Sequence, residues 1–318
     1  MFLYIVRRVL YTIPITLGVT LICFLLVHLG PGDPLNALLP EDASQASIDR
    51  MKAENGLDKP LPVQYVIWLG NALSGDLGNS IANGRSVSAE VVSALGNTLI
   101  LAFGGMLVSI TLGLMIGSIA GSRPGSLADR ILTGVAVIGV SVPHYWAAIV
   151  LVVIFAVGLG WLPAMGMDPR GSSGFIFDWA HLKHLVLPIL ALSLIPTGII
   201  ARSVRGAISE TYGQDFVQTL RAKGLPEWKV VLKSPVRLAL NPLVSTLGYL
   251  LPVLMSGSVI VSVVLGLPTE GPLLLRALLA EDLFVSATIV LLLGTLTVIG
   301  TLLSDILLGI LDPRIRMT

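Results

Sequence analysis

Long apolar runs alternate with shorter polar segments along this chain. The runs lie at Val9–Leu29, Thr98–Ala120, Ile131–Val157, Leu185–Ala201, Leu243–Leu265 and Val285–Leu308. Each is close to the roughly 20 apolar residues that a helix needs to cross the hydrocarbon core of a bilayer. A membrane β-barrel would show short alternating segments instead, and these do not dominate here. The pattern therefore predicts an all-α polytopic membrane protein with six transmembrane helices.

Composition supports this class of protein. The 318 residues are 54% hydrophobic and only 12% charged, whereas a soluble domain carries about 25% charged residues. The single cysteine, Cys23, lies in the first apolar run, so an internal disulfide cannot form. The first run is too long for a signal peptide and lacks a small-residue cleavage motif, so we interpret it as a retained first span.

Charge is distributed unevenly between the polar segments. If the N-terminus is cytoplasmic, the segments on that side are 1–8, 121–130, 202–242 and 309–318. Together with Asp305 they hold 13 Lys and Arg residues against six acidic residues. The opposite side holds seven Lys and Arg residues against 13 acidic residues. The positive-inside rule therefore predicts that both termini are cytoplasmic.

The predicted spans divide the chain into four parts. They are residues 1–30 with the first span, an external segment 31–97, a transmembrane core 98–310 that contains the polar loop 202–242, and a cytoplasmic tail 311–318. The external segment contains two amphipathic stretches, at 44–56 and Val63–Leu73. We expect short surface helices there, with Tyr65 and Trp68 at the level of the lipid headgroups.

Several residues within the spans are typical of helix packing. Small residues recur every four positions along the second span, at Gly105, Ser109, Gly113, Gly117 and Gly121. Such a stripe allows close backbone approach, either inside one subunit, which we favour, or at a subunit interface. Pro143 and Pro252 are expected to kink the third and fifth spans. We interpret His144 as a packing or interface residue.

The segment 202–242 is basic and amphipathic, although its surroundings are membrane-like. Seven of the 20 Lys and Arg residues lie between Arg202 and Arg237. Ile208, Tyr212, Phe216 and Leu220 repeat every four residues and predict one helical face that ends near Ala222. Gly224 then suits a helix C-terminus with positive φ, and Pro226 suits the first turn of a second helix. That second helix would have an apolar face made of Trp228, Val231 and Leu232. Such a pair of helices could dock on a soluble protein or lie on anionic lipid.

Motifs for other functions are weak. A nucleotide-binding loop of the form G-x-x-x-x-G-K-[ST] does not occur, so we do not expect this chain to hydrolyse ATP. An intramembrane enzyme is a rival hypothesis, but Gly171-Ser172-Ser173-Gly174 is better explained as a flexible loop than as a serine nucleophile. His181 and His184 are too few ligands for a metal site. An ion-coupled transporter would need ionisable residues within the spans. The spans are nearly free of such residues. Asp305 is the exception, and we expect partial solvation or pairing with Arg314 or Arg316 there.

Motifs along nearly the whole chain resemble those of one family. They are LGPGDPL at 29–35, GLDKPLPVQY at 56–65, GDLGNS at 75–80, SVPHYW at 141–146, LGWLPAMG at 159–166, DFVQTLRAKGL at 215–225 and LSDILLGILDPRIR at 303–316. In this order they resemble ABC transporter permeases of the dipeptide, oligopeptide and nickel family. The closest likeness is to the permease with a long external segment after its first span.

The resemblance implies a fold, a site and partners. The fold would be that of a type I ABC importer permease, located in a bacterial or archaeal inner membrane. In the family, the loop corresponding to 202–242 carries the EAA motif and docks a short coupling helix on the ATPase. The matching positions here are Asp215, Phe216, Thr219, Arg221, Ala222, Lys223, Gly224, Leu225 and Pro226. Leu220, Ser234-Pro235 and Leu238 depart from the family pattern.

The implied partners are a homologous second permease, two ABC ATPase subunits, an extracytoplasmic solute-binding protein and membrane lipid, without nucleic acid. ATP and Mg would be bound by the ATPase subunits, and this chain would hold no cofactor. The cargo would be peptides, or alternatively nickel chelates, opines or oligosaccharides.

Overall fold

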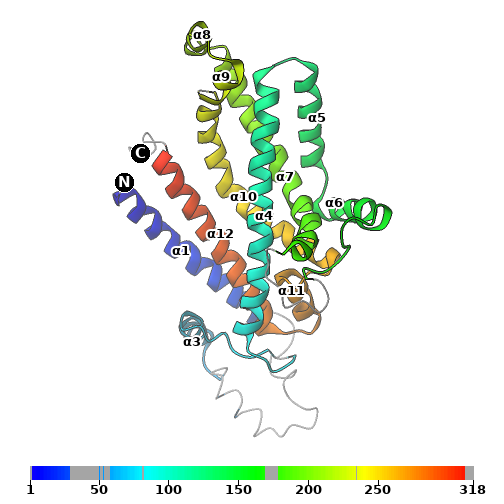
Figure 1. Ribbon diagram of the computed structural model, residues 1–318. Coiled ribbons are helices and arrows are strands. Elements are labelled where there is room, and N and C mark those ends of the chain that lie inside the picture. Colours follow the sequence, from blue (N-terminus) through cyan, green and yellow to red (C-terminus); the bar gives the residue numbers. More distant parts are fainter. Residues whose placement is uncertain are drawn as a thin grey trace. The chain divides into compact units, whose positions relative to one another are not determined.

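The protein is built from helices. The structure, a computed structural model, describes residues 2–28, 50, 53, 58–80, 82–168, 178–233 and 235–311. In chain order the helices are α1 (Phe2–His28), α3 (Leu61–Leu73), α4 (Val87–Ser122), α5 (Leu127–Ser141), α6 (His144–Leu151), the π-helix η1 (Val152–Gly158), α7 (Trp179–Tyr212), α8 (Asp215–Ala222), α9 (Glu227–Lys233), α10 (Pro235–Leu265), α11 (Glu270–Leu279) and α12 (Leu283–Leu311). The predicted all-α class is confirmed (Figure 1).

Length and apolar composition identify the helices that can span a membrane. In the described part of the chain, α1, α4, α7 and α12 qualify alone. Two bent pairs qualify together, α5 with α6 and η1, and the end of α10 with α11. Four spans result, or six if each bent pair counts as one, which agrees with the apolar runs of the sequence.

The chain forms two compact units. Unit 1 consists of Met1–Arg8, Thr98–Leu267 and Ile299–Thr318, and unit 2 consists of Val9–Asn97 and Pro268–Val298. The unit boundaries therefore fall inside α1, α4 and α12. Each unit has its own buried apolar core.

Unit 1 is organised around α7. Figure 1 shows α7 between α5 and α10, and these helices pack against it. Two buried clusters form its core. One includes Leu101, Leu192, Leu254 and Val261, and the other includes Ile200, Val204, Ile208, Leu243 and Leu250. The four-residue spacing of Ile200, Val204 and Ile208 places them on one face of α7, which explains why this helix is so well buried.

The stripe of small residues on α4 lies against α7 within the same chain. A methyl group added at Gly113 would lie 2.5 Å from Cγ2 of Ile200, and one at Gly117 would lie 2.6 Å from the carbonyl oxygen of Ala201. A methyl group at Gly121 would lie 2.9 Å from Cβ of Ile208 on α7, and one at Gly105 would lie 3.5 Å from Cβ of Leu192 on α7 and 3.1 Å from Leu254 on α10. The Ser109 hydroxyl donates to the carbonyl oxygen of Ser193 at 3.1 Å. These contacts permit the close helix packing that small residues make possible where lipid surrounds the protein.

The third apolar run is two helical segments and not one kinked helix. The axes of α5 and of the α6–η1 segment differ by 108°. Val142 has ψ 122° and Pro143 has ψ 143°, both extended, because a proline disfavours the helical conformation of the residue before it. The expectation of one kinked helix over Ile131–Val157 is therefore corrected. By contrast, the helical conformation of α10 continues through Pro252, where we expected a kink.

His144, at the start of α6, packs against two neighbouring helices. Its Nδ1 lies 3.1 Å from the carbonyl oxygen of Ala191 on α7, and its ring covers Gly257 on α10. This agrees with the packing role predicted from the sequence. Asp305 also has a partner in unit 1, since Nη1 of Arg8 lies 3.3 Å from Oδ2 of Asp305. The predicted partners Arg314 and Arg316 lie outside the described residues.

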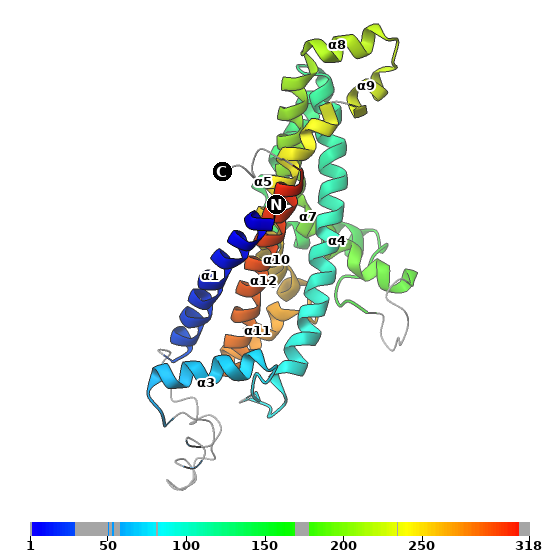
Figure 2. The ribbon, with the colours of Figure 1, turned by 90° about the vertical axis from the view of Figure 1, so that its left-hand side faces the viewer.

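Unit 2 joins the first helix to the external segment. Figure 2 shows α3 lying crosswise to α1. The Tyr65 hydroxyl lies 2.6 Å from the Thr20 hydroxyl, and the rings of Tyr65 and Trp68 lie 5.4 Å and 5.9 Å from that of Phe24. Both aromatic residues thus contact α1, and their place at the level of the headgroups stays a prediction. The predicted amphipathic stretch at 44–56 lies almost entirely outside the described residues.

Candidate coupling loop

The basic segment between α7 and α10 forms a two-helix loop in unit 1. Helix α7 ends at Tyr212, α8 and α9 follow, and α10 begins at Pro235. Figures 1 and 2 show α8 and α9 beyond the ends of α7 and α10, away from the main bundle of unit 1. The loop is therefore available to a partner on its outer surface.

The bend between α8 and α9 depends on one glycine. Gly224 has φ +73°, so the positive φ predicted from the sequence is confirmed. Its N–H donates to the carbonyl oxygen of Arg221 at 2.8 Å, which closes the C-terminus of α8. Pro226 follows in an N-terminal position, and its carbonyl oxygen accepts from the N–H groups of Lys229 and Val230 at 2.9 Å and 3.2 Å. Pro226 thus lies one residue before α9, just outside the first turn in which we expected it.

A charged and aromatic cluster holds the two helices together. The Tyr212 hydroxyl donates to Oε1 of Glu227, and Nη2 of Arg221 donates to the same oxygen at 2.9 Å. The Arg221 guanidinium also lies 4.5 Å from the centre of the Tyr212 ring, within the range of a cation–π contact. We call Tyr212, Arg221 and Glu227 the loop clamp. It joins the end of α7, the end of α8 and the start of α9.

The loop clamp affects the protonation of its carboxylate. The hydrogen bonds from Arg221 and then from Tyr212 lower the pKa of Glu227 below its usual range. The same carboxylate raises the pKa of Arg221, because it stabilises the charged guanidinium. Glu227 is therefore ionised at neutral pH and the clamp is a true ion pair.

The structure corrects the predicted apolar faces of this loop. We expected Phe216 and Trp228 on the apolar faces of the two helices. They are 38% and 61% exposed, whereas Val217 and Val230, which the predicted faces left out, are completely buried. The prediction assumed one uninterrupted helix through Gly213. The helix is broken there, since Gly213 ends α7 and Gln214 has ψ 154°. This break shifts the helical phase and turns the side chain of Phe216 outward.

The residues matched to the coupling motif lie together on α8 and at the bend. The exposed members are Asp215, Phe216, Thr219, Ala222, Lys223, Gly224 and Pro226, whereas Arg221 and Leu225 are half-buried. The Thr219 hydroxyl donates to the carbonyl oxygen of Asp215 at 3.0 Å. Most of the set thus presents an outward surface, but Arg221 is engaged within the loop clamp.

We did not predict from the sequence the ion pair between Asp129 on α5, which is buried, and Arg205 on α7, which is partly exposed. Asp129 at the start of α5 is almost completely buried, and its carboxylate accepts from Nε of Arg205 at 2.5 Å and from Nη2 at 2.8 Å. The Gly125 N–H donates to the same carboxylate at 2.9 Å. Ser126 caps α5 by accepting from the Asp129 N–H at 3.1 Å. The Ser-x-x-Asp spacing of a capping box was the sequence signal that could have indicated this helix start.

Two histidines considered for a metal site each lie next to one protein oxygen in the described part of the chain. Nε2 of His181 lies 3.7 Å from Oδ1 of Asp168, and Nδ1 of His184 lies 3.2 Å from the carbonyl oxygen of Gly166. Within the described ranges, His, Cys, Asp and Glu side chains form no group of three or more that could hold a metal. The Gly171–Gly174 segment lies outside those ranges.

Comparison with known proteins identifies this architecture. Residues 109–317 match the family model described as "Binding-protein-dependent transport system inner membrane component", and residues 1–102 match the model of its N-terminal part. The chain is 36% identical to the oligopeptide transport system permease protein AppB of Bacillus subtilis, over 98% of this chain and 99% of AppB. It is 32% identical to the dipeptide transport system permease protein DppB of Alkalihalophilus pseudofirmus, over 99% and 100% of the two chains.

A solved structure shares the fold. The inward-facing MetNI methionine ABC transporter has a chain that matches with a TM-score of 0.56 and 20% identity, covering 70% of this chain and 96% of that one. At this identity the likeness concerns the fold alone.

Proposed function

This chain belongs to the family of binding-protein-dependent transport system inner membrane components, and from that premise we propose that it forms the path for short peptides in an ATP-driven importer. The names of the relatives AppB and DppB, which refer to oligopeptide and dipeptide transport, support peptides as the cargo. The subunit itself performs transport and is not an enzyme.

The loop of α8 and α9 is the coupling site in this proposal. The observation that carries it is the outward surface of α8, where Asp215, Phe216 and Thr219 are exposed next to the Gly224 bend. An exposed aromatic side chain among polar neighbours is typical of a protein-binding surface, because its burial on docking contributes most of the binding energy. The partner is an ABC ATPase subunit, which binds the ATP and Mg that this chain does not.

Movement at the loop reaches the bundle through packed helices. The loop clamp fixes α8 and α9 to the end of α7. Seven residues earlier on α7, Arg205 is joined to α5 through Asp129, and the small residues of α4 pack closely on the same helix. Closely packed helices of this kind move as a rigid body, so displacement of the loop by the ATPase would tilt them together. Alternating access of the path follows from that tilt.

The remaining partners follow from the way such a path must be built. A second homologous permease would complete the path, a second ATPase would bind its loop, and a solute-binding protein would deliver the peptide from outside. The excess of Lys and Arg in residues 202–242 supports a cytoplasmic location for the loop, with both termini on the same side.

Orientation is tested with single cysteines in a Cys23→Ser background. Ser74 after α3 and Gln214 before α8 are both exposed. On intact cells an impermeant maleimide should label Ser74→Cys, and should label Gln214→Cys only after lysis. Labelling of Gln214→Cys from outside would show that the loop cannot meet a cytoplasmic ATPase.

The cargo is tested by uptake. A strain lacking this chain should lose import of radiolabelled trialanine, and expression of the wild-type chain should restore it. If peptide uptake stays intact in the deletion strain and growth is lost only in nickel-limited medium, the peptide proposal is wrong and a metal chelate is the cargo.

A further inference from the structure

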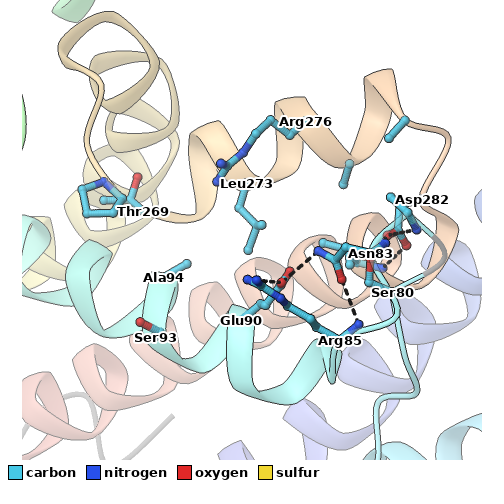
Figure 3. A pocket seen from close by; sticks show the side chains of 15 residues that line it. Ser80, Asn83, Arg85, Glu90, Ser93, Ala94, Thr269, Leu273, Arg276 and Asp282 are labelled. Atoms are coloured by element: carbon cyan, nitrogen blue, oxygen red, sulfur yellow. Dashed lines mark hydrogen bonds and ion pairs between the residues drawn. The ribbon is translucent and has the colours of Figure 1, made fainter.

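A polar cavity of about 400 Å³ lies within unit 2, apart from the coupling loop. Figure 3 shows α11 on one side, with Thr269 and Arg276, and the start of α4 on the other, with Glu90 and Ser93. Arg85 and Asn83 lie beside Glu90 in the segment that leads into α4. Both walls come from segments that the charge pattern places on the external side of the membrane. The cavity is within the size range of small-molecule sites, roughly 300 to 1,000 Å³.

The acidic groups of this cavity are already engaged with the protein. Asp282 accepts from the Ser80 hydroxyl at 2.5 Å and from the N–H groups of Ala82 and Val285, each at 3.2 Å. Oε1 of Glu90 accepts from the Asn83 side-chain amide at 2.9 Å and lies 3.9 Å from Nη1 of Arg85. The carboxylates thus serve mainly to hold the walls together, and little acceptor capacity remains for a ligand.

Several donors, in contrast, are unused. Arg276 is exposed, and its Nε donates to the carbonyl oxygen of Pro272 at 3.3 Å. The other N–H groups of this guanidinium have no protein partner among the described residues and face solvent. Thr269 is 1% exposed and begins α11, but its hydroxyl caps no backbone N–H and has no partner within the described residues. A buried hydroxyl without a partner is destabilising, so a ligand that accepts from it would remove that penalty.

The groups of this cavity that have no protein partner in the described part of the chain, on Arg276 and Thr269, are both hydrogen-bond donors. A guanidinium and a hydroxyl both donate, and a guanidinium binds a carboxylate through two parallel hydrogen bonds. We propose that this cavity binds the C-terminal carboxylate of a short peptide, with Arg276 as its ion-pair partner and Thr269 as a second donor. The inference rests on the proposed peptide function and adds a recognition site in this chain. The volume beyond the carboxylate leaves room for the last residue of the peptide.

The test compares trialanine with its C-terminal amide. Binding of each is measured by equilibrium dialysis on the purified permease–ATPase complex in nanodiscs, without the binding protein, so that only this chain and its assembly can select the ligand. The wild-type complex should bind trialanine at least about tenfold more tightly than the amide, because a charge-assisted pair is lost in the amide. Arg276→Gln should weaken trialanine binding by about the same factor, and Thr269→Val by severalfold.

A matched control separates recognition from general attraction to positive charge. Lys59→Gln removes an exposed positive charge of unit 2 that does not line the cavity. It should leave trialanine binding unchanged, and neither Lys59→Gln nor Arg276→Gln should alter the amount of complex in the membrane. An equal loss in Lys59→Gln and Arg276→Gln would overturn the proposal.

The remaining outcomes are equally decisive. Equal binding of trialanine and its amide, or no binding of trialanine to the wild-type complex, contradicts the carboxylate site. If Arg276→Gln instead lowers only the affinity of the solute-binding protein, the cavity receives an acidic side chain of that protein and our assignment is wrong. Wild-type cells that import trialanine while the cavity fails these tests would leave the peptide function intact and refute the site alone.

Discussion

Gly224→Val tests whether the bend between α8 and α9 is needed for coupling. Gly224 has φ +73°, and a methyl group added there would meet no other atom within 4 Å. The cost of the substitution in the free protein is therefore backbone strain, about 1 to 2 kcal/mol for a side chain in the left-handed region, and a β-branched residue is at the upper end. An exposed ion pair such as that of Arg221 and Glu227 contributes only about 0.2 to 1 kcal/mol. The strain thus exceeds the ion pair, and the bend should rearrange.

The consequence is measured in three assays on the same samples. The amount of Gly224→Val protein in the membrane should equal that of the wild type, because the substitution does not change the spans. The ATPase subunits should co-purify at a reduced level, and hydrolysis should no longer be stimulated by the loaded binding protein. A shift of 1.4 kcal/mol corresponds to a tenfold change in the population of the docking conformation, so an effect of about five- to thirtyfold is expected. Gly224→Asn should be much milder, because asparagine tolerates positive φ.

Two glycines provide matched controls for this experiment. Gly213 lies in the same loop with negative φ and open space, so Gly213→Val should cost little. Gly160, after η1, has φ +64° and open space, so Gly160→Val carries similar strain away from the loop and from the Asp129–Arg205 pair. Wild-type uptake and stimulated hydrolysis in Gly224→Val, or an equal loss of stimulation in Gly160→Val, would refute the reasoning.

Three further predictions concern the loop clamp and the packing of α4. Glu227→Gln removes the charge that Arg221 contacts and should lower stimulated hydrolysis severalfold while ATPase co-purification falls less; unchanged stimulation would contradict the role of the clamp. Because the pKa of Glu227 is lowered in the folded loop, its stabilisation is complete above the usual glutamate pKa and is lost as the pH falls through the lower folded value. The fluorescence of Trp228, with the other tryptophans replaced, should therefore be constant from pH 8 to about 5 and change below about 4, and Glu227→Gln should remove the change. Gly117→Leu would bring a side chain within 2.6 Å of a backbone oxygen and should lower the unfolding temperature of the complex, whereas Gly134→Leu, which meets open space, should not.

The large features of the fold could be predicted because they depend on local properties. An apolar run of sufficient length becomes a helix in a membrane almost regardless of its neighbours, since its backbone groups must be satisfied internally. The positive φ of Gly224 could be predicted for a similar reason, because a glycine between two helix patterns has few other uses. These inferences needed only neighbouring residues in the chain.

The features that sequence reasoning missed depend on distant contacts or on helix phase. Asp129 and Arg205 are 76 residues apart, and Ser80 and Asp282 are 202 apart, so spacing could not indicate either pair. The break at Gly213 reverses the inward and outward faces of α8, although the four-residue repeat continues across it. The 108° turn at Pro143 exceeds the bend that proline alone implies, because the packing of α6 on α7 and α10 determines where the chain continues.

The length of helix α7 determines how a displacement at its loop end would be converted into tilt, if the proposed coupling holds. Its 34 residues extend about 51 Å at 1.5 Å per residue, compared with roughly 30 Å for the hydrocarbon core of a bilayer. A tilt of about 10° around its far end would move Tyr212 by about 9 Å, and a displacement of about 5 Å at that tip corresponds to only about 6° of tilt. Under the proposed coupling, an ATPase bound at the loop would act through this long arm, and a displacement of several ångströms at Tyr212 would become a small rotation of α7 and the helices packed on it.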